Sequence, residues 1–157
     1  MARTEHVIST TPDRVFAILA DGWTYSDWVV GTAHIRDVDP DYPAPGTTIH
    51  HKAGPWPVSL RDTSTVLDFE PDRMLLLRIG LWPLGEGRVR LTLTPVGTTA
   101  TRVTMVEDFH DGPLLWLRNK VNDVALHYRN RESLRRLGDL AVRRAARSRQ
   151  NSGKPRP

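Results

Sequence analysis

A long run of strand-and-turn patterns, followed by one long helical pattern, limits the folds open to this chain more than any other feature. Between Val29 and Phe109, segments of about 8 to 14 residues rich in Thr, Val, Leu and Ile alternate with turn signals. The turns at 39–46, 70–72 and 95–97 contain proline, glycine or aspartate. This spacing is typical of antiparallel strands joined by hairpins, and about six strands fit into the segment.

Two of these strands show which side chains face the interior. In each of them apolar residues alternate with polar ones, as in a strand with one buried face. Glu107 shares the parity of the apolar residues in the second strand, so a carboxylate is predicted on the buried face. The apolar positions are Val89, Leu91 and Leu93 in one strand and Val103, Met105 and Phe109 in the other.

Helical patterns lie on both sides of the strands. A short strand pattern at the N-terminus leads to a helix with Thr11 as its N-cap and Pro12 as its first residue, followed by a second short helix or turn. The long helical pattern begins after Pro113, with apolar residues at spacings of three and four. These residues are Leu114, Leu117, Val121, Val124, Ala125 and Tyr128, continued by Leu134, Leu137 and Ala141.

The order of these elements predicts an α+β fold. A curved antiparallel sheet of about six to seven strands needs a cover for its apolar face, and the long C-terminal helix is the one element that can supply it. One or two short helices follow the first strand. Because a curved sheet touches a single helix along only part of its length, an internal cavity is predicted between them.

The residues that mark this order are the strand 6–9, the helix 11–21, Trp23, Trp28, the turn 69–74 and the terminal helix. Together they resemble the SRPBCC superfamily (START-related, helix-grip), and within it the bacterial polyketide cyclase/dehydrase-like branch. The resemblance covers about residues 3 to 145. It implies a cavity for a hydrophobic ligand; members include cyclases, aromatases, lipid and hormone carriers and co-chaperone domains. No catalytic motif of the family transfers to this chain.

Composition excludes several kinds of site. The 157 residues include no cysteine, which excludes disulfides, thiolate metal sites and cysteine nucleophiles. The histidines are dispersed and no glycine-rich nucleotide motif occurs, so neither a metal nor a cofactor is expected. No signal-peptide pattern and no apolar run of membrane-spanning length is present, so we expect a cytoplasmic protein without a transmembrane segment.

Positive charge is concentrated near the C-terminus. Six basic residues and no acidic ones lie between residues 143 and 157, and without them the net charge of +4 becomes −2. We expect a single domain over residues 1–149 and a disordered basic tail over 150–157. The body offers no basic face, so no nucleic acid is expected as a partner, while an acidic partner could contact the tail. The helix dipole and solubility account for the arginines equally well.

Three polar residues on predicted inner faces are candidates for acid–base chemistry. A carboxylate such as Glu107 is costly to ionise in an apolar interior, so it is either a proton donor or acceptor, paired with an arginine, or wetted at the strand end. His51 shares the parity of Ile49, and Asp62 follows Leu60 at an alternating position. Glu107 and His51 are the catalytic candidates, and a structural histidine is the alternative for His51.

The other candidates are ligand contacts. Trp28, Trp56 and Trp82 lie near predicted loops or strand ends, where they would stack on a flat ligand or pack a small core. The remaining candidate ligand-binding residues are Asp62, Met105 and Phe109 on strands and Val124 and Tyr128 on the long helix.

Three functions fit these patterns. The first is binding or carriage of a hydrophobic or aromatic small molecule, including lipids, in the cavity. The second is a polyketide cyclase, aromatase or dehydratase, which requires Glu107 to converge with His51, Asp62 or Tyr128. The third is a protein-interaction domain that uses the basic tail, whose complex would weaken as salt is raised.

Overall fold

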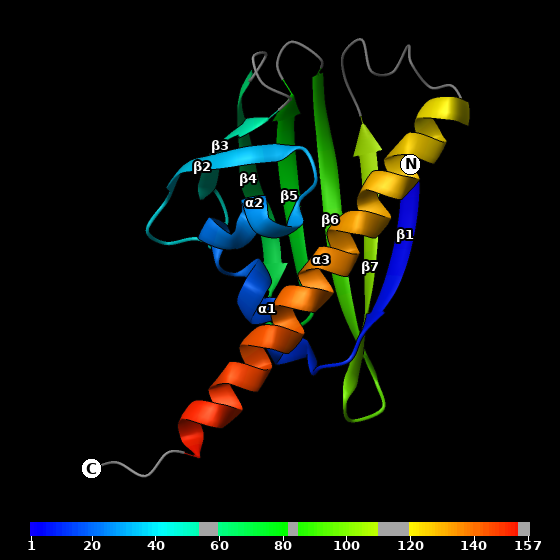
Figure 1. Ribbon diagram of the computed structural model, residues 1–157. Coiled ribbons are helices and arrows are strands. Elements are labelled where there is room, and N and C mark those ends of the chain that lie inside the picture. The colour runs from blue at the N-terminus through cyan, green and yellow to red at the C-terminus, as the bar shows by residue number, and fades with distance from the viewer. Residues whose placement is uncertain (54–59, 82–84, 110–119, 154–157) are drawn as a thin grey trace.

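The chain folds into one curved sheet with a long helix across it, as seen in a computed structural model that describes residues 1–53, 60–81, 85–109 and 120–153 (Figure 1). No helix in these ranges is long and apolar enough to cross a membrane. The helical elements are α1 (Pro12–Leu19), η1 (Gly22–Thr24), α2 (Tyr25–Trp28) and α3 (Lys120–Ser152). The strands are β1 (Ala2–Ile8), β2 (Thr32–Val38), β3 (Thr48–Ala53), β4 (Leu60–Glu70), β5 (Met74–Leu81), β6 (Gly85–Val96) and β7 (Ala100–Phe109).

The sheet has seven strands in the order β1-β7-β6-β5-β4-β3-β2, and all neighbouring pairs are antiparallel. Consecutive hairpins connect β2 to β7, while β1 adds to the far edge through its pairing with β7. The α+β helix-grip fold predicted from the sequence, with short helices after the first strand, is confirmed. The strand patterns at 89–93 and 103–109 have the predicted inward parity, with Val103 and Leu91 fully buried.

Helix α1 begins where the sequence predicted. Thr11 is the N-cap residue and Pro12 follows at the first helical position, where a missing N–H costs nothing. The Thr11 hydroxyl makes no capping hydrogen bond; instead the Thr11 carbonyl accepts from the N–H groups of Arg14 and Val15. Asp13 in the first turn lies at the positive end of the helix dipole.

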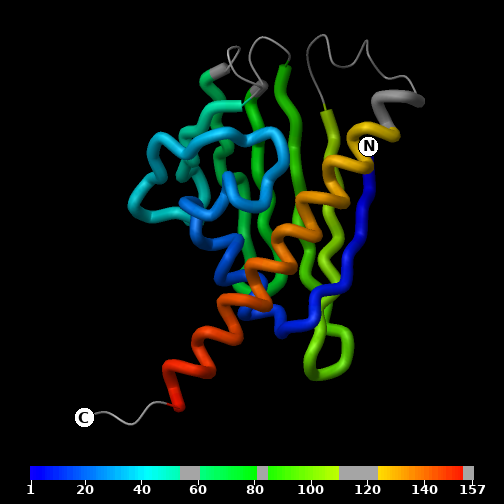
Figure 2. The backbone as a smooth tube through the Cα atoms, viewed as in Figure 1, coloured from blue at the N-terminus to red at the C-terminus, as the bar shows by residue number. Residues whose placement is uncertain are grey.

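Helix α3 crosses the concave face of the sheet and contacts β1, α1 and α2 (Figure 2). Leu134, Leu137 and Ala141 face the core and are almost completely buried, together with apolar residues of α1. The helix extends to Ser152, three residues into the segment expected as a tail. This packing fills the space between the sheet and the part of α3 around residues 134–141.

The helical stripe predicted for residues 114–128 does not continue the one at 134–141. Val124 and Tyr128 are 56% and 69% exposed. Six residues separate Tyr128 from Leu134, which places them about 120° apart around a helix of 3.6 residues per turn. Since Leu134 faces the core, Tyr128 faces away from it. Leu114 and Leu117 lie outside the described residues.

Candidate functional site

A cavity of about 570 Å³ lies between the sheet and helix α3, on the side where α2 leads into β2. Its size is that of a typical pocket for a small organic ligand. Much of the wall is apolar, including Trp28, Leu77, Ile79, Val89, Leu91 and Met105. The cavity therefore offers a mainly apolar, partly open space with a few polar groups at defined places.

The structure brings half of the predicted site residues to this cavity. Trp28, His51, Asp62, Met105 and Glu107 line it. Phe109 is half-buried, packs on the core and does not line the cavity. The exposed Val124 and Tyr128 do not line it either, for the helical phase reason given above, and Trp56 and Trp82 lie outside the described residues.

Glu107 is held by two neighbouring side chains of α3. Its side chain is completely buried, and Arg129 Nη2 donates to its Oε1 in an ion pair. Asn130 Nδ2 donates to the other oxygen, Oε2, at 2.8 Å. Arg129 also donates from Nε and Nη2 to Asn130 Oδ1, at 3.2 and 3.1 Å. Of the alternatives for this carboxylate, pairing with an arginine is therefore the one that the structure has.

His51 belongs to a buried chain of hydrogen bonds. Its Nε2 lies 3.0 Å from Ser64 Oγ, which lies 3.0 Å from the Tyr25 hydroxyl. The Tyr25 ring also packs against the imidazole, with 5.4 Å between ring centroids. Burial lowers the pKa of His51 to about 4, assisted by the positive charge of Arg36, so the imidazole is neutral at pH 7. Burial likewise raises the pKa of Tyr25 to about 12.

Asp62 is the cross-strand partner of His51 in the β3–β4 ladder, so the two side chains are on the same face of the sheet. One carboxylate oxygen, Oδ1, accepts the N–H of Thr63 at 2.7 Å. The side chain has no ion pair with any residue in the described ranges. Burial raises the pKa of Asp62 to about 6, so this carboxyl exchanges its proton near neutral pH.

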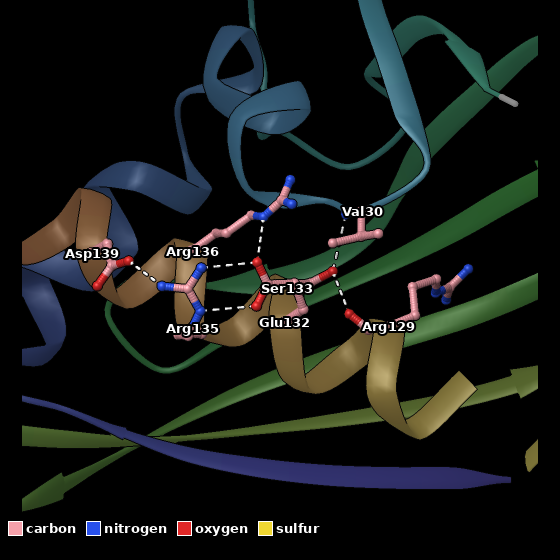
Figure 3. Close-up of polar contacts among 7 residues, drawn as sticks. All are labelled: Val30, Arg129, Glu132, Ser133, Arg135, Arg136 and Asp139. Carbon is pink, nitrogen blue, oxygen red and sulfur yellow. Dashed lines mark hydrogen bonds and ion pairs between the residues drawn. The ribbon is translucent and has the colours of Figure 1, made fainter. Parts of the chain in front are cut away.

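Helix α3 also fixes the segment that leads from α2 into β2. Ser133 Oγ accepts the N–H of Val30 at 3.0 Å and donates to the carbonyl of Arg129 at 3.0 Å (Figure 3). Val30 and Gly31 line the cavity, so this one contact ties a wall of the cavity to the helix. Figure 3 also shows the neighbouring network of Glu132 with Arg135 and Arg136, which is largely exposed, and none of these three residues lines the cavity.

Removing the Ser133 hydroxyl is expected to loosen this wall. Ser133→Ala should raise the hydrogen-exchange rate of the Val30 amide about five- to tenfold, because one buried hydrogen bond contributes about 1 kcal/mol. Ser148→Ala is the matched control, since Ser148 makes the same bond to the carbonyl four residues earlier but is exposed. An unchanged Val30 exchange rate in Ser133→Ala would mean that the wall is held by packing alone.

The sequence did not identify Arg129, Asn130, Tyr25 or Ser64 as site residues. An arginine partner for Glu107 was one of the alternatives that the sequence left open, because a buried carboxylate is costly without a cation. The arginine-rich helix offers several candidates, and the choice of Arg129 depends on its rotation about its axis. Tyr25 contacts Ser64 on β4 and His51 on β3, and no local pattern indicates these contacts between distant segments.

Comparison with known proteins extends these observations. The family model described as "Polyketide cyclase / dehydrase and lipid transport" matches residues 2–142. No curated protein sequence matches the chain.

Three solved structures illustrate the similarity in fold. The Zhui aromatase/cyclase from a Streptomyces species is 16% identical, with a TM-score of 0.70 over 91% of this chain and 94% of its own. A conserved protein from Geobacillus kaustophilus is 13% identical, with a TM-score of 0.73 over 90% and 94%. The di-domain aromatase/cyclase StfQ of steffimycin biosynthesis is 12% identical, with a TM-score of 0.64 over 92% and 52%. At these identities the likeness establishes the shared fold.

Proposed function

Because this chain belongs to the polyketide cyclase/dehydrase and lipid transport family, we propose that it binds a hydrophobic or aromatic small molecule inside its cavity. The observation that carries this proposal is the cavity of about 570 Å³, which is partly open to solvent and has mainly apolar walls. Burial of a ligand's apolar surface there is worth about 25 cal/mol per Å² before the costs of association are subtracted. An apolar molecule of 12 to 20 heavy atoms, as a rough estimate, fits such a volume.

The test is uptake of the neutral fluorophore N-phenyl-1-naphthylamine, followed by its emission. We expect one molecule to bind per chain, and we expect Val89→Phe to raise the Kd at least tenfold, roughly, because the larger ring occupies the cavity. Val7→Phe is the matched control, since Val7 lies on the outer side of β1 and is 49% exposed. Equal Kd values for the two variants would place the fluorophore outside the cavity.

One observation favours catalysis as a second function. Asp62 and His51 lie opposite each other on the cavity wall, and the carboxyl has a pKa of about 6, near the value that suits proton transfer at neutral pH. A cyclase or dehydratase reaction would use Asp62 as the acid or base, with Glu107 fixed by Arg129 and Asn130. Turnover that survives in Asp62→Asn with unchanged ligand affinity would reject this role.

A further inference from the structure

Asp62 has one oxygen that is open to the cavity and has no partner. The side chain is 5% exposed and lines the cavity. Its Oδ1 accepts the N–H of Thr63, whereas Oδ2 makes no hydrogen bond to any residue in the described ranges. Among the described residues, His51 Nδ1 is the single side-chain nitrogen or oxygen that is both inaccessible and unpaired. Asp62 Oδ2 is unpaired but is not such an atom, so it is accessible from the cavity.

The charges on the cavity wall do not balance. Asp62 and Glu107 are acidic, and Arg129 is the one cation among the described lining residues. Arg129 is paired with Glu107, whose side chain is completely buried. Burial lowers the pKa of His51 to about 4 and raises that of Tyr25 to about 12, so both are uncharged at pH 7. The wall is therefore left with one negative charge that no described side chain compensates.

Asp62 carries this charge at neutral pH. Burial raises its pKa to about 6, and no charged neighbour in the described ranges contributes to the shift. About nine in ten molecules are then ionised at pH 7. A carboxylate that is removed from water is costly unless it gains a cation. A cationic ligand would supply the missing partner.

An organic cation fits this place better than a metal ion. Zinc and calcium sites use three or more protein ligands, and the described residues contain no group of three His, Asp or Glu side chains that could hold a metal. The apolar walls suit a carbon skeleton instead. Tyr25 and Trp28 also line the cavity, and the faces of aromatic rings attract ammonium groups.

We propose that Oδ2 of Asp62 accepts a hydrogen bond from the protonated amine of an apolar ligand, which makes this side of the cavity a subsite for lipophilic amines. This inference rests on the proposed binding function and names the chemical class of ligand. An ammonium group supplies both the positive charge and the N–H donor that the wall lacks. A neutral ligand would leave the charge of Asp62 uncompensated, and a carboxylate would meet a charge of the same sign, so amines are preferred to both.

The first test compares three naphthalenes of similar shape by calorimetry at pH 7.5, roughly: 2-naphthylmethylamine, 2-naphthylmethanol and 2-naphthoate. We expect the wild-type protein to bind the amine about tenfold more tightly than the alcohol, and the carboxylate most weakly. Asp62→Asn keeps the shape of the side chain and removes its charge, so the ratio of amine to alcohol affinity should fall to about one. Asp68→Asn makes the same change at an exposed position of the same strand and should keep the wild-type ratio.

The second test measures the protons released when the amine binds. At about pH 6 half of the Asp62 carboxyls are protonated, and the ion pair expels this proton, so about 0.5 proton should leave per bound amine. At about pH 8 almost none should leave, because the carboxyl is already ionised and an alkylamine is protonated at both pH values. Calorimetry in buffers of different ionisation enthalpy gives the number. The release should vanish in Asp62→Asn and persist in Asp68→Asn. Equal release by wild type and Asp62→Asn would overturn the proposal.

The outcomes separate this proposal from the one it rests on. If N-phenyl-1-naphthylamine enters the cavity but the ratio of amine to alcohol affinity is the same in wild type and Asp62→Asn, the amine subsite is rejected and the binding function stands. If neither the fluorophore nor any of the three naphthalenes binds, the binding function is rejected and the subsite with it.

Discussion

Replacing Arg129 by methionine is expected to lower the free energy of unfolding by about 3 kcal/mol at pH 7, the largest effect we predict for one substitution. The reason is the environment of Glu107, whose side chain is completely buried and depends on Arg129 for its countercharge. Without the guanidinium, the carboxylate keeps only the amide of Asn130 as a described partner. Urea denaturation followed by tryptophan fluorescence measures the loss.

Two controls test whether the loss comes from a stranded charge. In the double variant Glu107→Gln with Arg129→Met no buried charge remains, so it should be about 1 to 2 kcal/mol more stable than Arg129→Met alone. Arg131→Met removes an exposed arginine two residues further along the same helix and should change stability by less than about 0.5 kcal/mol. If Arg129→Met lowers the free energy of unfolding no more than Arg131→Met does, the Glu107 carboxylate does not depend on Arg129 and is solvated by water from the cavity.

This result bears on the role of Glu107. Both carboxylate oxygens of Glu107 accept hydrogen bonds, from Arg129 and from Asn130, so neither oxygen is free to contact a ligand without breaking one of these bonds. Glu107 is on β7 and its two partners are on α3, so these contacts connect the sheet to the helix next to the cavity. The predicted burial made Glu107 a candidate for catalysis, and in the structure the buried carboxylate forms an ion pair with Arg129 instead.

Strand parity is the feature that the sequence predicts best. The period of two along a strand fixes which side chains point inward, so the inward positions of His51, Asp62, Met105 and Glu107 all follow from alternation. The turn residues between hairpins fix the succession of strands. The curved sheet and its helix then follow, because no other predicted element is long enough to cover the apolar face.

Helical phase and contacts between distant segments are harder to predict. A stripe read from apolar residues is ambiguous when two stripes out of phase follow each other, as at Tyr128 and Leu134. The polar contacts of the cavity join segments far apart in the chain, such as Tyr25 with Ser64 and Glu107 with Arg129. They depend on how the elements are placed in space, which local patterns do not encode.

Replacing His51 and replacing Asp62, each in a separate variant, are expected to change the pH dependence of the free energy of unfolding in opposite directions. The pKa of His51 falls from 6.5 to about 4 on folding, so the folded state resists its protonation and loses stability as the pH drops from 6.5 towards 4. The pKa of Asp62 rises from 3.8 to about 6, so the folded state favours its protonation and gains stability as the pH drops from 6 towards 4. In the wild-type protein the two contributions offset each other.

Each single variant therefore exposes the contribution of the other residue. One pKa unit corresponds to about 1.4 kcal/mol, and allowing for water in the cavity each contribution is about 2 kcal/mol. Asp62→Asn should be about 2 kcal/mol more stable than wild type at pH 7, an advantage that vanishes by about pH 4. His51→Gln should change the other way and recover about 2 kcal/mol relative to wild type between pH 7 and pH 4.

The measurement is the free energy of unfolding of each variant minus that of wild type, taken from urea curves between pH 4 and 8, so that other titrating groups cancel. Asp68→Asn removes an exposed carboxylate from the same strand as Asp62 and is the matched control. Opposite slopes for the two cavity variants would mean that one wall of the cavity holds a neutral imidazole beside a carboxyl that titrates near pH 6. Parallel or flat slopes would mean that water in the cavity keeps both groups close to their ordinary pKa values, and the case for acid–base chemistry at this wall would fail.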